Sequence, residues 1–169
     1  EMKHELLGEM ISSVSDEEKL PKSIQKTSAL AKFSSDKNYL KNSLNYHIHR
    51  ACVKLRKINA KCKGVSIFLR TKDFRVFSEK KVLNVATDFE LEISDIVFNL
   101  LDKMFNPNIL YRSTGVILDT FVFNDEAQMS LFANETVDEK KEKLSKCFDK
   151  LEARFGKDII QTGFVKKDV

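Results

Sequence analysis

The chain has 169 residues, of which 42% are hydrophobic and 32% charged, with 5 glycines and 2 prolines. A single domain of roughly 100 to 150 residues buries a self-sufficient core, so the fold needs no disulfide or metal for stability. The longest apolar runs fall far short of the roughly 20 residues of a membrane-spanning helix, which argues against a membrane protein. The N-terminus is charged where a signal peptide has an apolar core, and it starts at Glu1 rather than Met. We therefore expect a piece of a longer protein that is not secreted.

Cysteine usage points to a reducing compartment. Cys52, Cys62 and Cys147 are an odd number of thiols at spacings that match neither a disulfide framework nor a zinc site. Reduced thiols of this kind are typical of a cytoplasmic protein. The sequence thus predicts a cytoplasmic location and no metal or other cofactor bound by this chain.

Positive charge is concentrated in one block. Residues 19–81 carry 17 Lys and Arg against 3 acids, an excess of +14, while residues 1–18 and residues 82–169 each carry a net charge of −5. Such a block attracts polyanions, and Lys and Arg that neutralise phosphates gain affinity by releasing counterions. Nucleic acid is the favoured partner, with a solvated basic surface and an anionic membrane surface as alternatives.

The first third of the chain predicts a linker, a strand and a helix. Residues 1–20 combine a short apolar patch with an acidic, weakly hydrophobic stretch before a proline, as in a linker. Residues 22–30 mix Thr, Ser and Ile without helical spacing and predict a first strand. Ser34, Ser35 and Asp36 form an N-cap cluster for an amphipathic helix. Its apolar stripe is Leu40, Leu44, Ile48, Ala51, Cys52, Leu55 and Ile58, and its opposite side carries Lys37, Lys41, Arg50, Lys54 and Lys57.

Four further elements follow in order. Residues 63–72, KGVSIFLRTK, alternate between two faces and predict the second strand. Asp73, Phe74 and Arg75 form a turn, and residues 80–87 predict the hairpin partner. A second helix spans residues 93–105, where apolar residues recur at 3-and-4 spacing until Asn106 and Pro107 stop it. Residues 111–123, YRSTGVILDTFVF, are rich in β-branched and aromatic residues and predict the fourth strand.

The resulting order, β-α-β-β-α-β, is the split βαβ pattern. It predicts an α+β fold in which both helices cover one face of a four-stranded sheet. The other face, free and basic, can lie along a nucleic acid. This domain occupies residues 21–123 and follows the linker at residues 1–20.

Beyond residue 123 the composition becomes polar and acidic. We expect a partner-binding segment over residues 124–137 and a C-terminal extension over residues 138–169. In the extension, the spacing of Leu144, Cys147, Phe148, Leu151 and Phe155 predicts a helix closed by Gly156, and residues 158–165 are a candidate short strand. The extension either packs onto the domain or extends free of it.

The sequence lacks the motifs of the common classes of catalytic site. Metal-dependent phosphoryl transfer needs clustered carboxylates, whereas Asp119 stands alone on its strand. No phosphate-cradling glycine loop and no serine-nucleophile motif occurs. His47 and His49 project about 200° apart around their helix, which disfavours a shared metal and favours structural roles. We therefore predict a non-catalytic chain.

One short segment is unusual in its context. Gln128, Met129, Ser130, Leu131 and Phe132 place apolar residues among acids and small polar residues. An apolar pair in such a stretch has nothing local to pack against and commonly docks into a partner's pocket. The segment matches the QxxLF-type peptide by which bacterial DNA polymerases and repair proteins hold the sliding clamp. The alternative is an element that packs on its own domain.

The succession KSIQKTSAL, a helix ending in CVKLRK, VSIFLRTKDF, YRSTGVILD and QMSLF resembles the C-terminal region of a Y-family DNA polymerase. The resemblance covers nearly the whole chain and comprises the little finger domain and a clamp-binding tail. The segment LSKCFDKLEARFG is similar to the extension of UmuC-type (ImpB/MucB/SamB) members, and 37 residues follow Phe132. The residues Thr27, Ser28, Ala29 and Leu30 depart from the family, which often has an aromatic residue after this threonine.

The resemblance implies specific partners. The family's sheet lies against primer-template DNA, with backbone amides and basic side chains near strand ends on the phosphates. By position, the candidates are Lys22, Ser23, Arg70, Thr71, Lys72 and Arg75. Such contacts position a duplex without reading its bases, which suits a damaged template. Gln128, Leu131 and Phe132 are implied to hold the sliding clamp and so to tether the polymerase near the primer end.

The resemblance also implies that the catalytic domains lie in other parts of the longer protein. The palm, fingers and thumb, with their metal-binding acids, are not in these residues. DNA-directed DNA polymerase activity in error-prone translesion synthesis, and its Mg²⁺, thus belong to the longer protein, and we expect this piece to be monomeric. Two alternatives remain. One is an RNA-binding module of the same topology, weakened because the aromatic-rich RNP signature is missing. The other is a non-enzymatic interaction protein that binds an acidic partner or the clamp.

Overall fold

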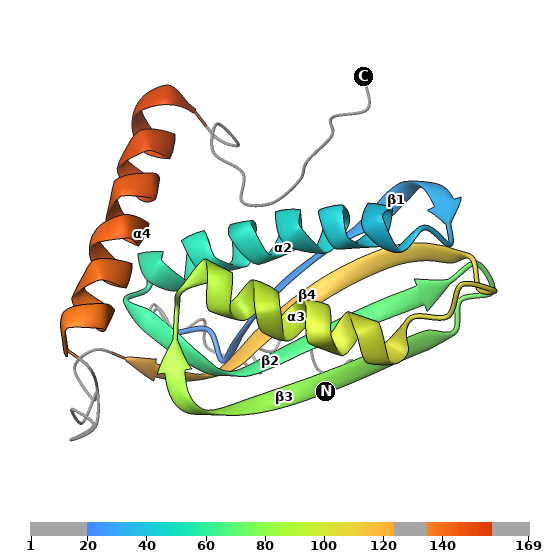
Figure 1. The fold of residues 1–169 in the computed structure, drawn as a ribbon, viewed down its shortest axis with the longest axis horizontal. Helices are drawn as coiled ribbons and strands as arrows, with labels where there is room; N and C mark the ends of the chain where they lie inside the picture. Colours follow the sequence, from blue (N-terminus) through green and yellow to red (C-terminus); the bar gives the residue numbers. More distant parts are fainter. Residues whose placement is uncertain (1–19, 124–134, 157–169) are drawn as a thin grey trace, which may run out of the picture.

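The computed structural model describes residues 20–123 and residues 135–156 (Figure 1). Its elements are β1 (Ser23–Ser34), α2 (Lys37–Lys57), β2 (Ala60–Thr71), β3 (Val76–Thr87), α3 (Glu90–Met104), β4 (Tyr111–Phe123) and α4 (Glu135–Phe155). The first six follow the predicted order β-α-β-β-α-β. The α+β fold class is confirmed.

The four strands form one antiparallel sheet in the order β1-β4-β2-β3. The central pair, β4 and β2, runs in register from Val65 opposite Leu118 to Arg70 opposite Ser113. Helices α2 and α3 lie side by side across one face of this sheet, as predicted (Figure 1). The split order brings the first and last strands of the domain together as neighbours.

Helix α2 begins where the cap cluster predicted. The Asp36 carboxylate accepts a hydrogen bond from the Asn38 amide at 2.8 Å, and the Ser34 hydroxyl accepts one from the Asp36 amide at 3.0 Å. These bonds satisfy amides that the helix itself cannot pair. Helix α3 ends at Met104, immediately before the Asn106-Pro107 stop that the sequence predicts.

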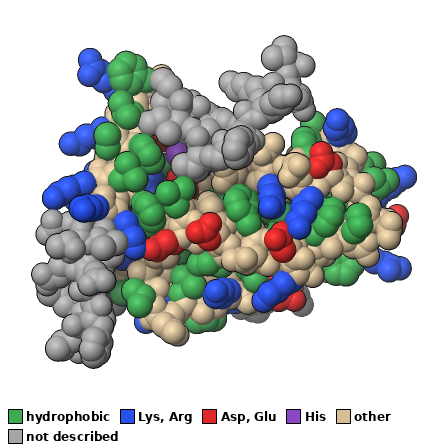
Figure 2. Space-filling view, viewed as in Figure 1, with side chains coloured by type: hydrophobic (Ala, Val, Ile, Leu, Met, Phe, Trp, Pro, Cys, Tyr) green, Lys and Arg blue, Asp and Glu red, His purple; other side chains and the backbone are tan. Residues whose placement is uncertain are grey.

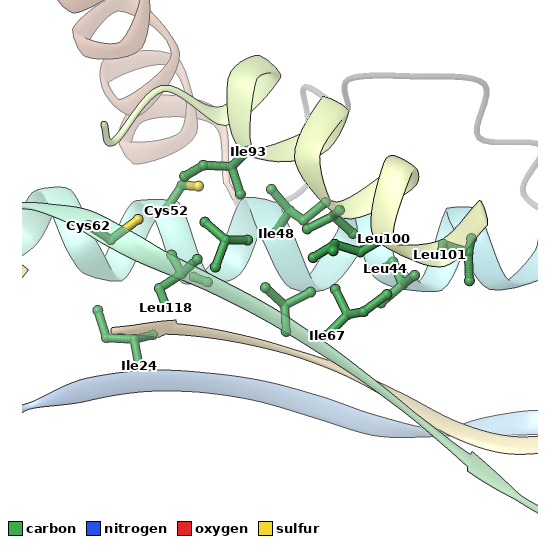
Figure 3. Packing of buried hydrophobic residues seen from close by; sticks show 14 of the residues in the cluster. Ile24, Leu44, Ile48, Cys52, Cys62, Ile67, Ile93, Leu100, Leu101 and Leu118 are labelled. Atoms are coloured by element: carbon green, nitrogen blue, oxygen red, sulfur yellow. The ribbon is translucent and has the colours of Figure 1, made fainter. Parts of the chain in front are cut away.

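The core lies between the sheet and the two helices (Figure 3). Leu44 and Ile48 of α2 and Leu101 of α3 are fully buried against Ile67 of β2 and Leu118 of β4. Full burial of one such side chain contributes about 1.5–3 kcal/mol. The predicted stripe of α2 is therefore the surface that holds the helix on the sheet.

Three strands are longer than the sequence predicted, and of these β2 starts at Ala60, before the predicted start at residue 63. Strand β1 continues past Leu30 to Ser34, across an irregularity after which Ser34 pairs with Tyr111. Strand β3 starts at Val76, directly after the turn, because its first half pairs with the end of β2. Pairing with a neighbour, which local propensity does not record, sets both limits.

Helix α4, which contains most of the described part of the C-terminal extension, packs onto the domain. It stands at the end of the helix layer where α2 finishes and α3 starts (Figure 1). The Arg56 guanidinium of α2 donates to both Asp149 carboxylate oxygens, at 2.8 and 2.7 Å, and Lys141 donates to Glu92 of α3. The contact is thus largely ionic.

The predicted apolar stripe of α4 is not its main contact with the domain. Leu144 and Phe155 are exposed, whereas Ser145 is buried. Gly156 ends the helix with a φ of 102° and donates its amide to the Glu152 carbonyl, as its cap position predicted. The strand candidate at residues 158–165 lies outside the described residues. None of the described helices is long and apolar enough to cross a membrane.

Candidate nucleic-acid interface

The sheet has a face that the helices leave uncovered. Val65, Ile67 and Leu69 of β2 point into the core, so by strand alternation Ser66 and Phe68 point the other way. The registers then define this open face. It comprises Ser23, Gln25, Thr27 and Ala29 of β1, Ser113, Gly115, Ile117 and Asp119 of β4, Gly64, Ser66, Phe68 and Arg70 of β2, and Val76, Ser78, Lys80 and Val82 of β3.

The two central strands of the open face carry small side chains at several positions. Phe68 lies across its neighbour Gly115, where an added Cβ would come within 2.2 Å of the ring. Ser66 and Ser113 are almost fully covered although they face away from the helices. Gly115 therefore makes room for the Phe68 ring, which lies over the backbone on the open face.

One ion pair neutralises part of the open face. The Lys80 ammonium donates to both Asp119 oxygens at 2.7 Å, and the Asp119 carboxylate covers Gly64, where a Cβ would come within 1.9 Å of an oxygen. Partial burial alone would raise the pKa of this carboxyl, but the hydrogen bonds from Lys80 and Thr120 outweigh it and lower the pKa. Lys80 is therefore a cation with a fixed partner.

Many cations of the basic block lie in the helix layer rather than on the sheet face, which the sequence predicted to be free and basic. Figure 2, which views the molecule from the helix side, shows Lys and Arg intermixed with Asp and Glu. Lys37 pairs with Asp102 of α3 at 2.9 Å, and Lys41 lies 5.3 Å from the ring centre of Phe98. These lysines help to join the two helices.

A group of cations also lies at the tip of the β2–β3 hairpin, defined here as residues 70–75. Arg70, Lys72 and Arg75 are exposed there. Within the described parts of the chain, none of the three forms an ion pair. The three cations predicted to contact phosphate therefore lie together at one end of the open face.

Thr71 has a different place from the other candidates at the tip. Only 4% of its surface is exposed, and its hydroxyl accepts a hydrogen bond from the Arg75 amide at 3.2 Å. Its own amide donates to the Arg75 carbonyl at 2.9 Å, and its carbonyl accepts from the Phe74 amide at 3.0 Å. Thr71 thus closes the turn that presents the cations.

Lys22 and Ser23 lie at the other end of the sheet. Ser23 pairs with Asp119, whereas Arg70 pairs with Ser113, six residues away along β4. At the rise of a strand, this separation is about 20 Å. The structure therefore divides the candidate contacts into two groups at opposite ends of the open face, and all of them except Thr71 are exposed.

The sequence analysis missed Arg112. Its guanidinium lies 4.3 Å from the ring centre of Phe74, so it brings a further cation from β4 to the hairpin tip. The Lys72 amide donates to the Leu110 carbonyl at 2.8 Å, which fixes the tip beside the start of β4. The predicted element order, which is that of the split βαβ pattern, was the one signal that could have placed Arg112 there.

The two histidines of α2 both make contacts within the fold. His47 is 2% exposed, and its Nε2 lies 3.3 Å from the Ser28 hydroxyl oxygen. His49 lies between the carboxylates of Glu90 and Glu152, at 2.9 and 2.7 Å. Among the residues with described side chains, no group of three or more His, Cys, Asp or Glu is arranged to hold a metal ion.

The predicted clamp-binding residues, Gln128, Met129, Ser130, Leu131 and Phe132, lie outside the described residues. The segment that contains them connects the end of β4 at Phe123 with the start of α4 at Glu135. Both of its neighbours are parts of the folded domain or are packed against it.

Comparison with known families places the domain. The model of the impB/mucB/samB family C-terminal domain matches residues 21–131. DNA polymerase IV of Acetivibrio thermocellus is 27% identical over 116 residues, which are 68% of this chain and 29% of that protein. Protein UmuC of Salmonella typhimurium is 26% identical over 132 residues, 75% of this chain and 31% of that protein. The chain thus spans about 30% of the length of these relatives.

Solved structures share the fold. A Y-family DNA polymerase chimera of Dbh and Dpo4 has a TM-score of 0.55 at 20% identity, over 67% of this chain and 32% of its own. DinB from Sulfolobus solfataricus has a TM-score of 0.53 at 17% identity, over 60% of this chain and 29% of its own. With the family match over more than half of the sequence, the chain belongs to the impB/mucB/samB family and contains the C-terminal domain of a Y-family DNA polymerase.

Proposed function

We propose that this chain holds primer-template DNA for a translesion DNA polymerase, with the open face against the duplex and the hairpin tip on its phosphates. The observation that carries the proposal is the group of Arg70, Lys72 and Arg75, three exposed cations without ion-pair partners in the described residues, beside a face that no helix covers. Cations that already have a carboxylate partner gain less from a phosphate. The free ones therefore decide where DNA binds.

The two ends of the open face give this proposal a geometry. Lys22 and Ser23 contact the phosphate backbone at one end and the tip cations contact it at the other, about 20 Å away along the strands. Contacts of this kind fix the orientation of the duplex and leave the bases unread. A polymerase that copies damaged templates needs such indifference to sequence.

The longer protein supplies the chemistry in this proposal. Its remaining domains carry the Mg²⁺-binding carboxylates and the polymerase activity, and this chain supplies affinity and orientation. Gln128, Leu131 and Phe132 dock into a sliding clamp, which raises the local concentration of polymerase at the primer end. The impB/mucB/samB match and the names of the relatives support this division.

A charge-matched pair of triple variants tests DNA binding. Arg70, Lys72 and Arg75 are changed to Ala in one variant, and Arg50, Lys54 and Lys57 of α2 in the other, so both lose three positive charges. Binding to a labelled primer-template is followed by fluorescence anisotropy at salt concentrations from about 50 to about 300 mM, a range that includes physiological ionic strength. Since each phosphate contact contributes about 0.9 to the slope of log affinity against log salt, the tip variant should lose about 2–3 from that slope.

The helix variant separates local contacts from net charge. It should keep a slope close to that of the wild type, because its cations lie on the side of the helix layer away from the sheet. Equal losses in both variants contradict the assignment of the tip. Tighter binding to single-stranded RNA than to primer-template DNA favours the RNA-binding alternative instead.

A second titration tests the clamp contact. The chain is added to a purified bacterial sliding clamp, alongside a variant with Gln128, Leu131 and Phe132 changed to Ala. A control variant changes Met129 and Ser130, which the motif leaves unspecified. The proposal expects binding that the first variant abolishes and the control keeps; equal binding by all three proteins, or by none, refutes it.

A further inference from the structure

Phe74 is exposed in a way that the fold does not require. It sits at the hairpin tip with 62% of its surface accessible and with a backbone φ of 65°. Side chains other than glycine rarely adopt this left-handed conformation, and an aromatic residue adopts it at a cost in free energy. A glycine would satisfy the turn more easily. An exposed ring in a strained position points to a function for the ring itself.

The Phe74 ring also differs from other aromatic rings that have a Lys ammonium over them. Lys32, Lys37 and Lys41 lie over Tyr39, Phe105 and Phe98, and those three rings pack against the hydrophobic core. Phe74 is not among the residues that pack against that core. Arg112 stacks on it at 4.3 Å, the shortest of these cation–ring distances. The pair is therefore a stacked surface feature rather than a core contact.

The surroundings of this pair are strongly positive. Arg70, Lys72 and Arg75 come from the same tip and Arg112 from β4, against one carboxylate, that of Asp73. In the described residues none of these four cations has an ion-pair partner. An exposed aromatic ring among free cations is the arrangement by which proteins bind single-stranded nucleic acid, with bases on the rings and phosphates on the cations.

We propose that Phe74 stacks on an unpaired nucleobase of the DNA strand that extends beyond the duplex, with Arg112 supporting the ring from its other side. This rests on the proposed DNA-binding function and adds to it a site for single-stranded DNA. Bases inside a duplex are already stacked on their neighbours, so an exposed ring gains little from them. An unpaired base next to the duplex offers a free π-face at the level of the tip cations.

A protein partner fits the tip less well. The fully buried centre of a protein interface is depleted of charged residues, and four cations around one ring would have to lose water without carboxylates to replace it. A phosphate backbone supplies that compensation at every nucleotide. The charge around Phe74 therefore favours nucleic acid over an apolar pocket.

The test compares three DNAs on the full 169-residue chain. One is a blunt duplex, the second is the same duplex with a single-stranded overhang, and the third has an abasic overhang of the same length. The wild type should bind the second more tightly than the first and third. Because stacking on an aromatic ring contributes about a 5- to 100-fold gain in affinity per base, Phe74→Ala should lose a gain of that size on the overhang alone.

Three further variants separate the role of the ring from an effect on folding. Phe74→Gly removes the ring and the backbone strain together, so it should fold at least as stably as the wild type yet lose the overhang gain. Phe74→Tyr keeps a ring and should keep the gain. Tyr46→Ala removes an aromatic side chain of α2 that is 47% exposed and should leave all three affinities unchanged.

The outcomes are distinct. If the wild type binds duplex but gains nothing from the overhang, the stacking site is refuted and the proposed DNA-binding function stands. If Phe74→Gly and Phe74→Ala weaken blunt duplex and overhang equally, Phe74 only shapes the hairpin and the inference is again overturned. If no DNA binds at moderate salt, the proposed function itself fails.

Discussion

The pKa values of the two histidines of α2 should be shifted in opposite directions, although the residues are only two positions apart. His49 is held between Glu90 of α3 and Glu152 of α4, and all three side chains are at most 13% exposed. The hydrogen bond to Glu90 raises the pKa of His49, burial opposes it, and the charges of both carboxylates add to the rise, which brings it to about 9. Burial of His47 lowers its pKa to about 4.

These values predict how stability depends on pH. The pKa of His49 lies above its ordinary value of 6.5, so its contribution is present in full below pH 6.5 and is lost as the pH rises through about 9. The interval between 6.5 and 9 corresponds to about 3 kcal/mol of unfolding free energy. His47 has the opposite sign: its contribution is present above pH 6.5 and is lost as the pH falls toward 4.

Proton NMR of the imidazole Cε1 protons measures both values directly. Variants His47→Gln and His49→Gln assign the signals, and His4 of the N-terminal segment is a third signal. Glu152→Gln should lower the pKa of His49 while leaving that of His47 unchanged, because only His49 contacts α4. A midpoint near 6.5 for His49 in the wild type refutes the reasoning, since it means that neither Glu90 nor Glu152 holds its carboxylate on the imidazole.

Three further predictions concern the sheet and the thiols. Gly115→Ala places a methyl group 2.2 Å from the Phe68 ring and should cost about 1–3 kcal/mol of unfolding free energy by urea denaturation, and much less in a Phe68→Ala background. Asp119→Asn frees Lys80 on the open face, so DNA affinity and its salt dependence should both increase; removing Lys80 as well should restore the wild-type value. Cys147 is exposed while the other two cysteines are buried, so a thiol reagent should rapidly modify one thiol in the native chain and all three after denaturation.

The sequence predicted the elements and their buried faces well in segments where apolar residues recur with a single period. Alternation from Val65 to Leu69 and the stripe from Leu40 to Leu55 identified the elements and their buried faces, and these gave the sheet with two covering helices. The limits of β1 and β3 were less accurate, because pairing with β4 and β2 extends strands beyond their local signal. Register belongs to the pair of strands, and neither strand alone encodes it.

The candidate site was predictable in part for the same reason. Arg70, Lys72 and Arg75 are neighbours in the chain, so a single segment revealed their cluster. Arg112 joins Phe74 from a strand 38 residues later, and only the sheet order and the bulge near Tyr111 bring them together. The contact of α4 through Asp149 and Glu152 was hidden because its apolar stripe suggested a different buried face.

Charge illustrates why composition locates a binding surface only coarsely. The +14 block spans residues 19–81, yet its members have different roles once the chain is folded. Lys37 and Arg56 join helices through Asp102 and Asp149, and Lys80 is fixed by a carboxylate within the sheet. An ion pair contributes little field at a distance, because the two charges cancel. The field that a polyanion meets comes from the cations without partners, and the sequence cannot separate these from the rest until the fold assigns the acids.

That distinction bears on how the domain can hold DNA without preference for sequence. The tip cations sit on a turn closed by the buried Thr71, so their positions are fixed relative to the sheet, while their long side chains adapt to phosphates of any sequence. On the open face the central strands carry glycine or serine at four positions, and Phe68 and Asp119 cover the two glycines. In the proposed function, this rigid frame with adaptable phosphate contacts holds a duplex with damaged bases as firmly as an intact one, because the proposed contacts to the duplex lie on its phosphates.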